Sequence, residues 1–173
     1  MTIALTGHYS AYCGMLSLPV HDVEKMLMRN DCRLAPQSVT PAGQHPVILL
    51  LGNQTNVKFP FLPFLKTQYL EVTLSVPWVF NPSEPQPVMA HVSRLWLNKL
   101  LPTIGGRVFG FPKFWTRNEM TDTSYRVRSL LLGRPIVSAT YSAYGTSAKP
   151  ADFPYFEPLW PVFQQHFLQK LFC

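Results

Sequence analysis

The chain contains seventeen prolines among its 173 residues, and no other feature limits its fold so strongly. Proline fixes one backbone dihedral and lacks an amide donor, so it is disfavoured inside helices and inside central strands. Nine of the prolines fall between residues 36 and 87. We therefore predict short elements joined by rigid loops in place of long helices.

Apolar residues make up 47% of the chain and charged residues only 14%, well below the usual quarter, so much of the chain should be buried. The length predicts a single domain over residues 1–173. No apolar run is long enough to cross a bilayer, and the first residues lack the basic region of a signal peptide. We therefore expect a cytoplasmic protein with no membrane partner. The three cysteines lack CxxC spacing, which argues against a disulfide scaffold or a zinc site.

The net charge is +6 and the isoelectric point is about 9.4. A nucleic-acid-binding domain concentrates such charge on one face or along one helix. Here the arginines and lysines are scattered over helix-like and strand-like segments alike. We expect no nucleic-acid partner, and a scattered positive field also attracts small anionic substrates such as carboxylates.

Helical spacing of apolar residues predicts helices over residues 20–31 and 88–101, the second ended by Pro102. The segment 158–173 also has apolar residues on one helical face. Strands are predicted from Pro46 up to a Gly52–Asn53 turn, and over 68–79. A hairpin is predicted over 124–145, around Gly133–Arg134–Pro135. Because strands outnumber helices, the predicted class is α+β, mostly β.

Several common motifs are absent. Gly105 and Gly110 have the spacing of a phosphate-binding GxxxxGK loop, but the lysine comes two residues late, after Phe111 and Pro112. There is no GxGxxG, HExxH or GxSxG pattern. The five histidines are far apart in the sequence, so we expect surface or core histidines and neither a metal site nor a cofactor.

Glu71 is the only acidic residue between Leu34 and Ser83. It lies in a strict alternation of polar and apolar residues, "YLEVTLSV", which predicts a strand with two different faces. If its face is the outer one, Glu71 is an ordinary solvated residue. If its face lines a cleft, Glu71 is a buried carboxylate, and such groups are paired or functional.

Lys113 lies near the end of a largely apolar stretch, "GGRVFGFPKF", and two interpretations are open for it as well. Its stem can cover Phe111 or Trp115 while its ammonium reaches water. Alternatively, the amine is desolvated among Phe109, Phe111, Phe114 and Trp115. Desolvation favours the neutral amine, which can attack a ketone and form a Schiff base.

The stretch "GGRVFGFPK", residues 105–113, resembles the signature of the acetoacetate decarboxylase family, G-R-E-[IV]-[WY]-G-[FY]-P-K. Without a gap, the matching positions are Gly105, Val108, Phe109, Gly110, Phe111, Pro112 and Lys113. The stretch "QYLEVTLSVP" is similar to the family strand that carries the active-site glutamate, which places Glu71 there. The similar order and spacing extend from about Tyr12 to Gly145.

The resemblance implies a cone-shaped β-barrel with a few flanking helices, lacking the C-terminal strands of longer members, and a homo-oligomer. It implies that Lys113 condenses with a β-keto acid and that the protonated imine is the electron sink for loss of carbon dioxide. Glu71 then positions the substrate or handles a proton. Phe111 and Phe114 are the corresponding substrate-binding residues.

The chain departs from the family pattern in three places. Phe114 replaces a second lysine, Gly106–Arg107 replace an Arg-Glu pair, and only His8 stands where the decarboxylases have an arginine. These departures leave room for aldol, dehydration or hydrolysis chemistry on other keto acids. They also leave two alternatives: a small-molecule-binding protein without catalysis on the same fold, and a basic interaction domain.

Overall fold

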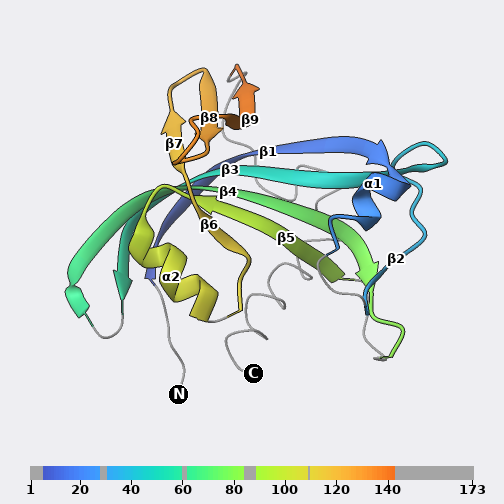
Figure 1. Ribbon diagram of the computed structural model, residues 1–173, viewed down its shortest axis with the longest axis horizontal. Helices are drawn as coiled ribbons and strands as arrows, with labels where there is room; N and C mark the ends of the chain where they lie inside the picture. The colour runs from blue at the N-terminus through green and yellow to red at the C-terminus, as the bar shows by residue number, and fades with distance from the viewer. Residues whose placement is uncertain (1–5, 28–30, 60–61, 84–88, 109, 143–173) are drawn as a thin grey trace. The chain divides into compact units, whose positions relative to one another are not determined.

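The computed structural model describes residues 6–27, 31–59, 62–83, 89–108 and 110–142 (Figure 1). Within these ranges the chain forms nine strands and two helices. In chain order they are β1 (Thr6–Pro19), α1 (Val20–Glu24), β2 (Arg33–Leu34), β3 (Gln44–Phe59), β4 (Leu62–Phe80), β5 (Met89–Leu97), α2 (Leu100–Val108), β6 (Lys113–Trp115), β7 (Arg117–Met120), β8 (Ser124–Arg128) and β9 (Pro135–Thr140).

The strands form two sheets. In the larger sheet the order is β1-β3-β4-β5-β6, and β2 pairs with β4 beside this path. β6 runs parallel to β5, with Lys113 opposite Leu95. The smaller sheet has the order β7-β8-β9, and its neighbours are antiparallel. The α+β, mostly β class is therefore confirmed.

The chain divides into two compact units, each assembled from three segments. Unit 1 comprises Met1–Cys13, Leu50–Thr73 and Arg94–Gly145, and unit 2 comprises Gly14–Leu49, Leu74–Ser93 and Thr146–Cys173. Neither unit is contiguous in sequence.

Unit 2 has an aliphatic core. Val23 of α1 packs there with Val47, Val76 and Val79, and all four side chains are fully buried. The imidazole of His45 is also buried, and its Nε2 lies 2.8 Å from the carbonyl oxygen of Pro77. Burial of these aliphatic side chains is the main stabilising contribution in this unit.

In unit 1, two asparagines hold the end of β5 against β4. The side-chain Oδ1 of Asn98 accepts a hydrogen bond from the backbone amide of Leu70 (2.8 Å), and the backbone amide of Asn98 donates to the Leu70 carbonyl (3.2 Å). The buried Asn118 donates from Nδ2 to the carbonyls of Leu70 (3.2 Å) and Trp96 (2.9 Å). These bonds fix the backbone on the N-terminal side of Glu71.

The prediction of a helix over 88–101 is wrong, because Met89–Leu97 forms the strand β5. From Ala90 to Leu97 all residues are buried except Val92 and Arg94. A strand buried on both faces does not show the alternation of apolar and polar residues that marks a half-exposed strand. The helix α2 begins later, at Leu100, and contains Gly105 and Gly106. Pro102 is compatible with the first turn of α2, because the backbone amides of a first turn donate no hydrogen bond within the helix.

The prediction of short elements is correct for the helices and wrong for the strands. The two described helices have five and nine residues, but β3 has 16 and β4 has 19. β3 continues through the predicted Gly52–Asn53 turn, and β4 contains Pro77, next to which Trp78 adopts a positive φ of 51°. The predicted helix over 20–31 is helical only from Val20 to Glu24 among its described residues.

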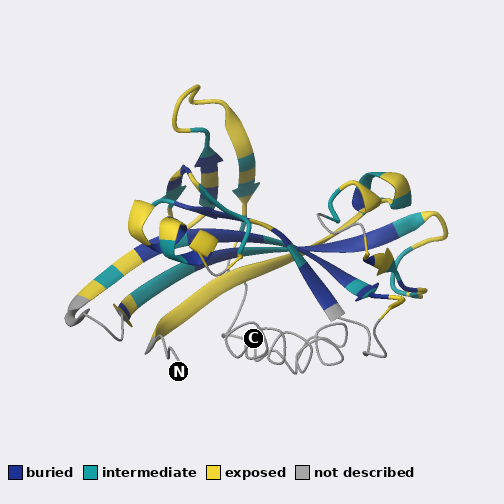
Figure 2. Ribbon diagram, turned by 60° about the horizontal axis from the view of Figure 1, so that its bottom comes forward, coloured by how far each residue is buried: buried dark blue, intermediate teal, exposed yellow. Residues whose placement is uncertain are grey.

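The hairpin around Gly133 is confirmed as β8 and β9. The predicted barrel is not observed, because the described strands form open sheets. Figure 2 shows that β1 is exposed from Gly7 to Ser17. Neither described helix has the length and apolarity needed to span a bilayer. The helical tail predicted over 158–173 lies outside the described residues.

Candidate active site

The polar face of β4 points into unit 1. Tyr69, Glu71 and Thr73 are each less than 8% exposed, so the alternation in this strand marks an inward polar face. Glu71 itself is 5% exposed, which excludes a solvated surface residue. The sequence allowed either a solvated or a buried Glu71, and in the structure the carboxylate is buried.

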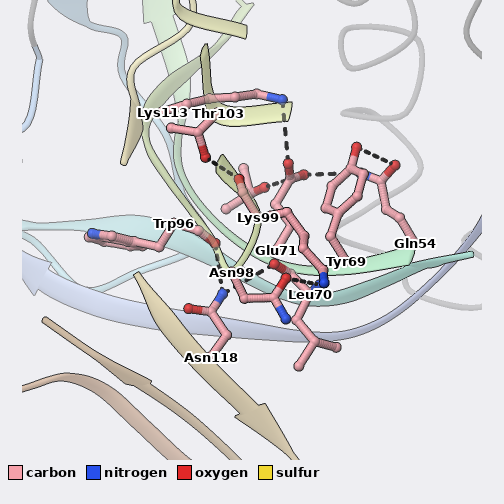
Figure 3. Close-up of polar contacts among 11 residues, drawn as sticks. Gln54, Tyr69, Leu70, Glu71, Trp96, Asn98, Lys99, Thr103, Lys113 and Asn118 are labelled. Carbon is pink, nitrogen blue, oxygen red and sulfur yellow. Dashed lines mark hydrogen bonds and ion pairs between the residues drawn. The ribbon is translucent and has the colours of Figure 1, made fainter. Parts of the chain in front are cut away.

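One carboxylate oxygen of Glu71 accepts hydrogen bonds and the other does not. Oε1 accepts weak hydrogen bonds from Nε2 of Gln54 (3.4 Å) and from Oγ1 of Thr73 (3.5 Å). Oε2 is buried and accepts no hydrogen bond, and it lies 3.7 Å from Nζ of Lys113 (Figure 3). Burial raises the pKa of Glu71, and the ammonium of Lys113 offsets part of this effect.

Lys113 begins β6, and its side chain is only 15% exposed. Its amine points toward Glu71 (Figure 3). The amine also lies 5.8 Å from the ring centroid of Phe111. The stem runs directly over Gly106, because a Cβ atom at Gly106 would overlap its Cδ and lie 2.5 Å from its Cε. The surface reading of Lys113 is therefore wrong, since the amine faces a buried acid.

The end of α2 holds the loop before Lys113. The amide of Phe111 donates to the carbonyl of Gly106 (2.9 Å), and Gly110 has a φ of 78°, which favours glycine. Nε of Arg107 donates to the carbonyl of Lys113 (2.6 Å). Gly106 and Arg107, the two departures from the family signature, thus both contact Lys113.

Three tyrosines add to this inward face, and the sequence did not identify them. The hydroxyl of Tyr69 donates to Oε1 of Gln54 (2.9 Å), and the hydroxyl of Tyr125 donates to the carbonyl of Gly52 (3.1 Å). The ring of Tyr9 packs over Gly52, where a Cβ atom would lie 2.5 Å from it. For the buried Tyr69 and Tyr125, burial raises the pKa and the negative charge of Glu71 raises it further, whereas Tyr9 is 49% exposed.

The structure brings Lys113, Glu71 and Phe111 together but does not add Phe114. Phe114 follows Lys113 in β6, so its side chain points to the opposite face of that strand. The guanidinium of Arg107 lies 5.4 Å from its ring centroid. His8 lies exposed on β1, and Phe109 is outside the described residues. No group of three potential metal ligands occurs in the described part of the chain.

A separate hollow of about 600 Å³ lies in unit 1. Amide side chains line it, among them Asn53, Gln68 and Asn98, and it includes neither Lys113 nor Glu71. It shares only Tyr69 with the polar face described above. The hollow and the amine–carboxylate pair are therefore distinct features of the same unit.

No model of a known protein family matches the chain, and no curated protein matches it. Two solved structures of the enduracididine biosynthesis enzyme MppR are similar to it. The similarity shows a shared fold. In both cases the TM-score is 0.57 and the sequence identity is 14%, over 88% of this chain. One MppR structure holds the condensation product of pyruvate and imidazole 4-carboxaldehyde, and the other holds HEPES buffer. This chain spans 60% and 59% of the length of the two MppR chains.

Proposed function

We propose that the chain is a Schiff-base-forming lyase that acts on a β-keto acid or a related keto acid through Lys113. The observation that carries the proposal is the 3.7 Å approach of Nζ of Lys113 to Oε2 of Glu71, an oxygen that accepts no hydrogen bond, with both side chains largely buried. A pair of titratable groups removed from water is typical of an active site.

Glu71 prepares the amine. An ion pair removed from water loses much of its hydration, which favours transfer of a proton from the ammonium to the carboxylate. Burial raises the pKa of Glu71, so this carboxylate is a stronger base than an exposed one. In the proposed mechanism Glu71 takes up the proton that the ammonium of Lys113 must lose before the amine attacks. Phe114 stands where the family has a second lysine, so here the proton is lost to Glu71 and not through repulsion by an adjacent ammonium.

The amine of Lys113 then attacks the ketone carbon of the substrate. The nitrogen loses one proton and the oxygen takes up two, one of them from Glu71, so the products are a protonated imine and water. The bond to the carboxylate carbon breaks, its electron pair moves into the imine, and carbon dioxide leaves. The resulting enamine is protonated on carbon, and water hydrolyses the imine to release the ketone and the amine.

The fold supports this assignment. The condensation product bound to MppR is built from a keto acid and an aldehyde, so a related fold accommodates keto-acid chemistry. The same imine intermediate also serves aldol condensation and dehydration, and the proposal therefore includes substrates other than simple β-keto acids.

A substrate panel tests the proposal. The wild-type chain is incubated with β-keto acids of increasing length, and with pyruvate plus an aldehyde, while carbon dioxide release and carbonyl consumption are measured. We expect at least one substrate to react, and Lys113→Arg to lose the activity by at least about 1,000-fold, because guanidinium cannot form the imine. Equal activity in Lys113→Arg and the wild type contradicts the proposal.

A second candidate is a small-molecule-binding protein without catalysis. The amide-lined hollow that excludes Lys113 favours it, since a ligand there would not meet the amine. In that case a carboxylate or polar ligand raises the melting temperature of the wild type and of Lys113→Ala equally. Loss of this shift in Lys113→Ala favours the lyase.

A further inference from the structure

The turn between β8 and β9 exposes three consecutive leucines. Leu130, Leu131 and Leu132 are 44%, 95% and 68% exposed. Leucine is among the residues most often buried in folded proteins, and a contiguous exposed apolar patch marks an interaction surface. We call residues 129–134 the leucine turn, and Figure 2 shows that it is exposed over most of its length.

The leucine turn has a defined backbone. The amide of Ser129 donates to the carbonyl of Arg134 (2.9 Å), and the amide of Gly133 donates to the carbonyl of Ser129 (3.0 Å). Gly133 has a φ of 63°, a conformation that glycine adopts without strain. The turn therefore presents its leucines in a fixed arrangement at the end of the hairpin.

Positive charge surrounds the leucine turn. Residues 124–140 contain three arginines, Arg126, Arg128 and Arg134, and no acidic residue. Arg128 also lies directly opposite Arg117 across β7 and β8. Like charges opposite one another destabilise a sheet. Arg117 has an exposed acidic neighbour, Glu119, at 3.1 Å, which offsets one of these charges.

We propose that the leucine turn binds to the surface of an anionic membrane, with Leu131 and Leu132 inserted among the acyl chains and the arginines on the lipid headgroups. Apolar burial and attraction to anionic lipids are the two contributions to binding at a membrane surface. Absence of a spanning helix does not bear on such binding. The sequence-based expectation of no membrane partner rested on the lack of a spanning segment, whereas this proposal concerns binding at the membrane surface.

The charges favour a membrane over a second copy of the chain. A two-fold contact through the leucine turn would bring Arg128 and Arg134 of both copies together, and their repulsion opposes it. The apolar residues of α2 are also exposed, but the arginine beside them, Arg107, is engaged with the carbonyl of Lys113 and the ring of Phe114. Apolar and free cationic side chains coincide at the leucine turn.

Co-sedimentation of the full chain with vesicles tests the proposal. One set of vesicles is pure phosphatidylcholine, and the other contains about one third phosphatidylserine. We expect at least about tenfold tighter binding to the anionic vesicles, because each arginine near the surface adds electrostatic attraction. Leu131→Gln should weaken this binding by about tenfold, since it removes one inserted side chain.

Two further variants test the roles of the leucines and of the arginines separately. Leu101→Gln replaces a leucine of α2 that is 58% exposed, and it should bind anionic vesicles as the wild type does. The double variant Arg128→Gln, Arg134→Gln should lose the preference for anionic vesicles. No binding of the wild type overturns the proposal, as does an equal loss in Leu101→Gln. Self-association that Leu131→Gln abolishes, without vesicle binding, also overturns it and assigns the turn to a dimer.

Discussion

Gly106 provides the space in which the stem of Lys113 lies. A methyl group on Gly106 would overlap Cδ of Lys113, whereas a methyl group on the preceding Gly105 would meet no atom within 4 Å. Gly106 is buried in α2. The stem of Lys113 passes over it, and Nζ lies 3.7 Å from Oε2 of Glu71. The direction of the Lys113 side chain therefore depends on the absence of a side chain at one helical position.

Gly106→Ala tests this dependence. The added methyl group should displace the flexible lysine stem while alanine favours the helix, so the melting temperature should change little. Misplacing a reacting group by about 1 Å costs about 100-fold in rate, so kcat of the proposed reaction should fall by about that factor with little change in KM. The matched control is Gly105→Ala, which should retain full activity. Equal activity in the two variants would show that the lysine does not need this space.

Glu71→Gln should alter the pH dependence of stability. Burial raises the pKa of Glu71 above its ordinary value of 4.5, so the folded chain favours the protonated carboxyl more than the unfolded chain does. The stabilisation is fully present below pH 4.5 and is lost as the pH rises through the raised pKa. In urea unfolding, the wild type should therefore lose stability relative to Glu71→Gln as the pH rises. Parallel stability curves for the two proteins contradict this expectation.

Asn118→Ala should destabilise unit 1. The buried amide of Asn118 donates to the carbonyls of Leu70 and Trp96, and its Oδ1 accepts a hydrogen bond from Thr116 (2.7 Å). Leaving such buried groups unpaired costs about 2–4 kcal/mol in the free energy of unfolding. Denaturant unfolding measures this loss. Asn53→Ala removes a more exposed amide with one weak bond of 3.4 Å and should cost less than about 0.5 kcal/mol.

The strand of Glu71 could be predicted from the sequence because its alternation is strict. The buried face could not, since the apolar Val72 and the polar Glu71 are both buried. β5 was predicted as a helix because a strand buried on both faces lacks alternation, and its apolar spacing also fits a helical face.

The sequence singled out Lys113 and Glu71, a resemblance to a family signature implied their roles, and their proximity required the structure. The positions of Tyr9 and Tyr125 could not be predicted, because they reach the same region from strands distant in sequence and their local sequence contains no motif. The role of Gly106 was hidden for a different reason. A glycine in a sequence indicates backbone freedom, whereas here its function is the space it leaves for another residue.

Reductive trapping measures the central chemical step most directly. The wild-type chain is mixed with a substrate that reacts in the panel, reduced with borohydride, digested, and mapped by mass spectrometry. Reduction of an imine leaves a stable secondary amine on the lysine that formed it. We predict a single substrate-dependent adduct on Lys113, absent from Lys113→Arg and strongly reduced in Gly106→Ala. An adduct on any other lysine, or turnover of the substrate without an adduct, would contradict the assignment of Lys113 as the nucleophile.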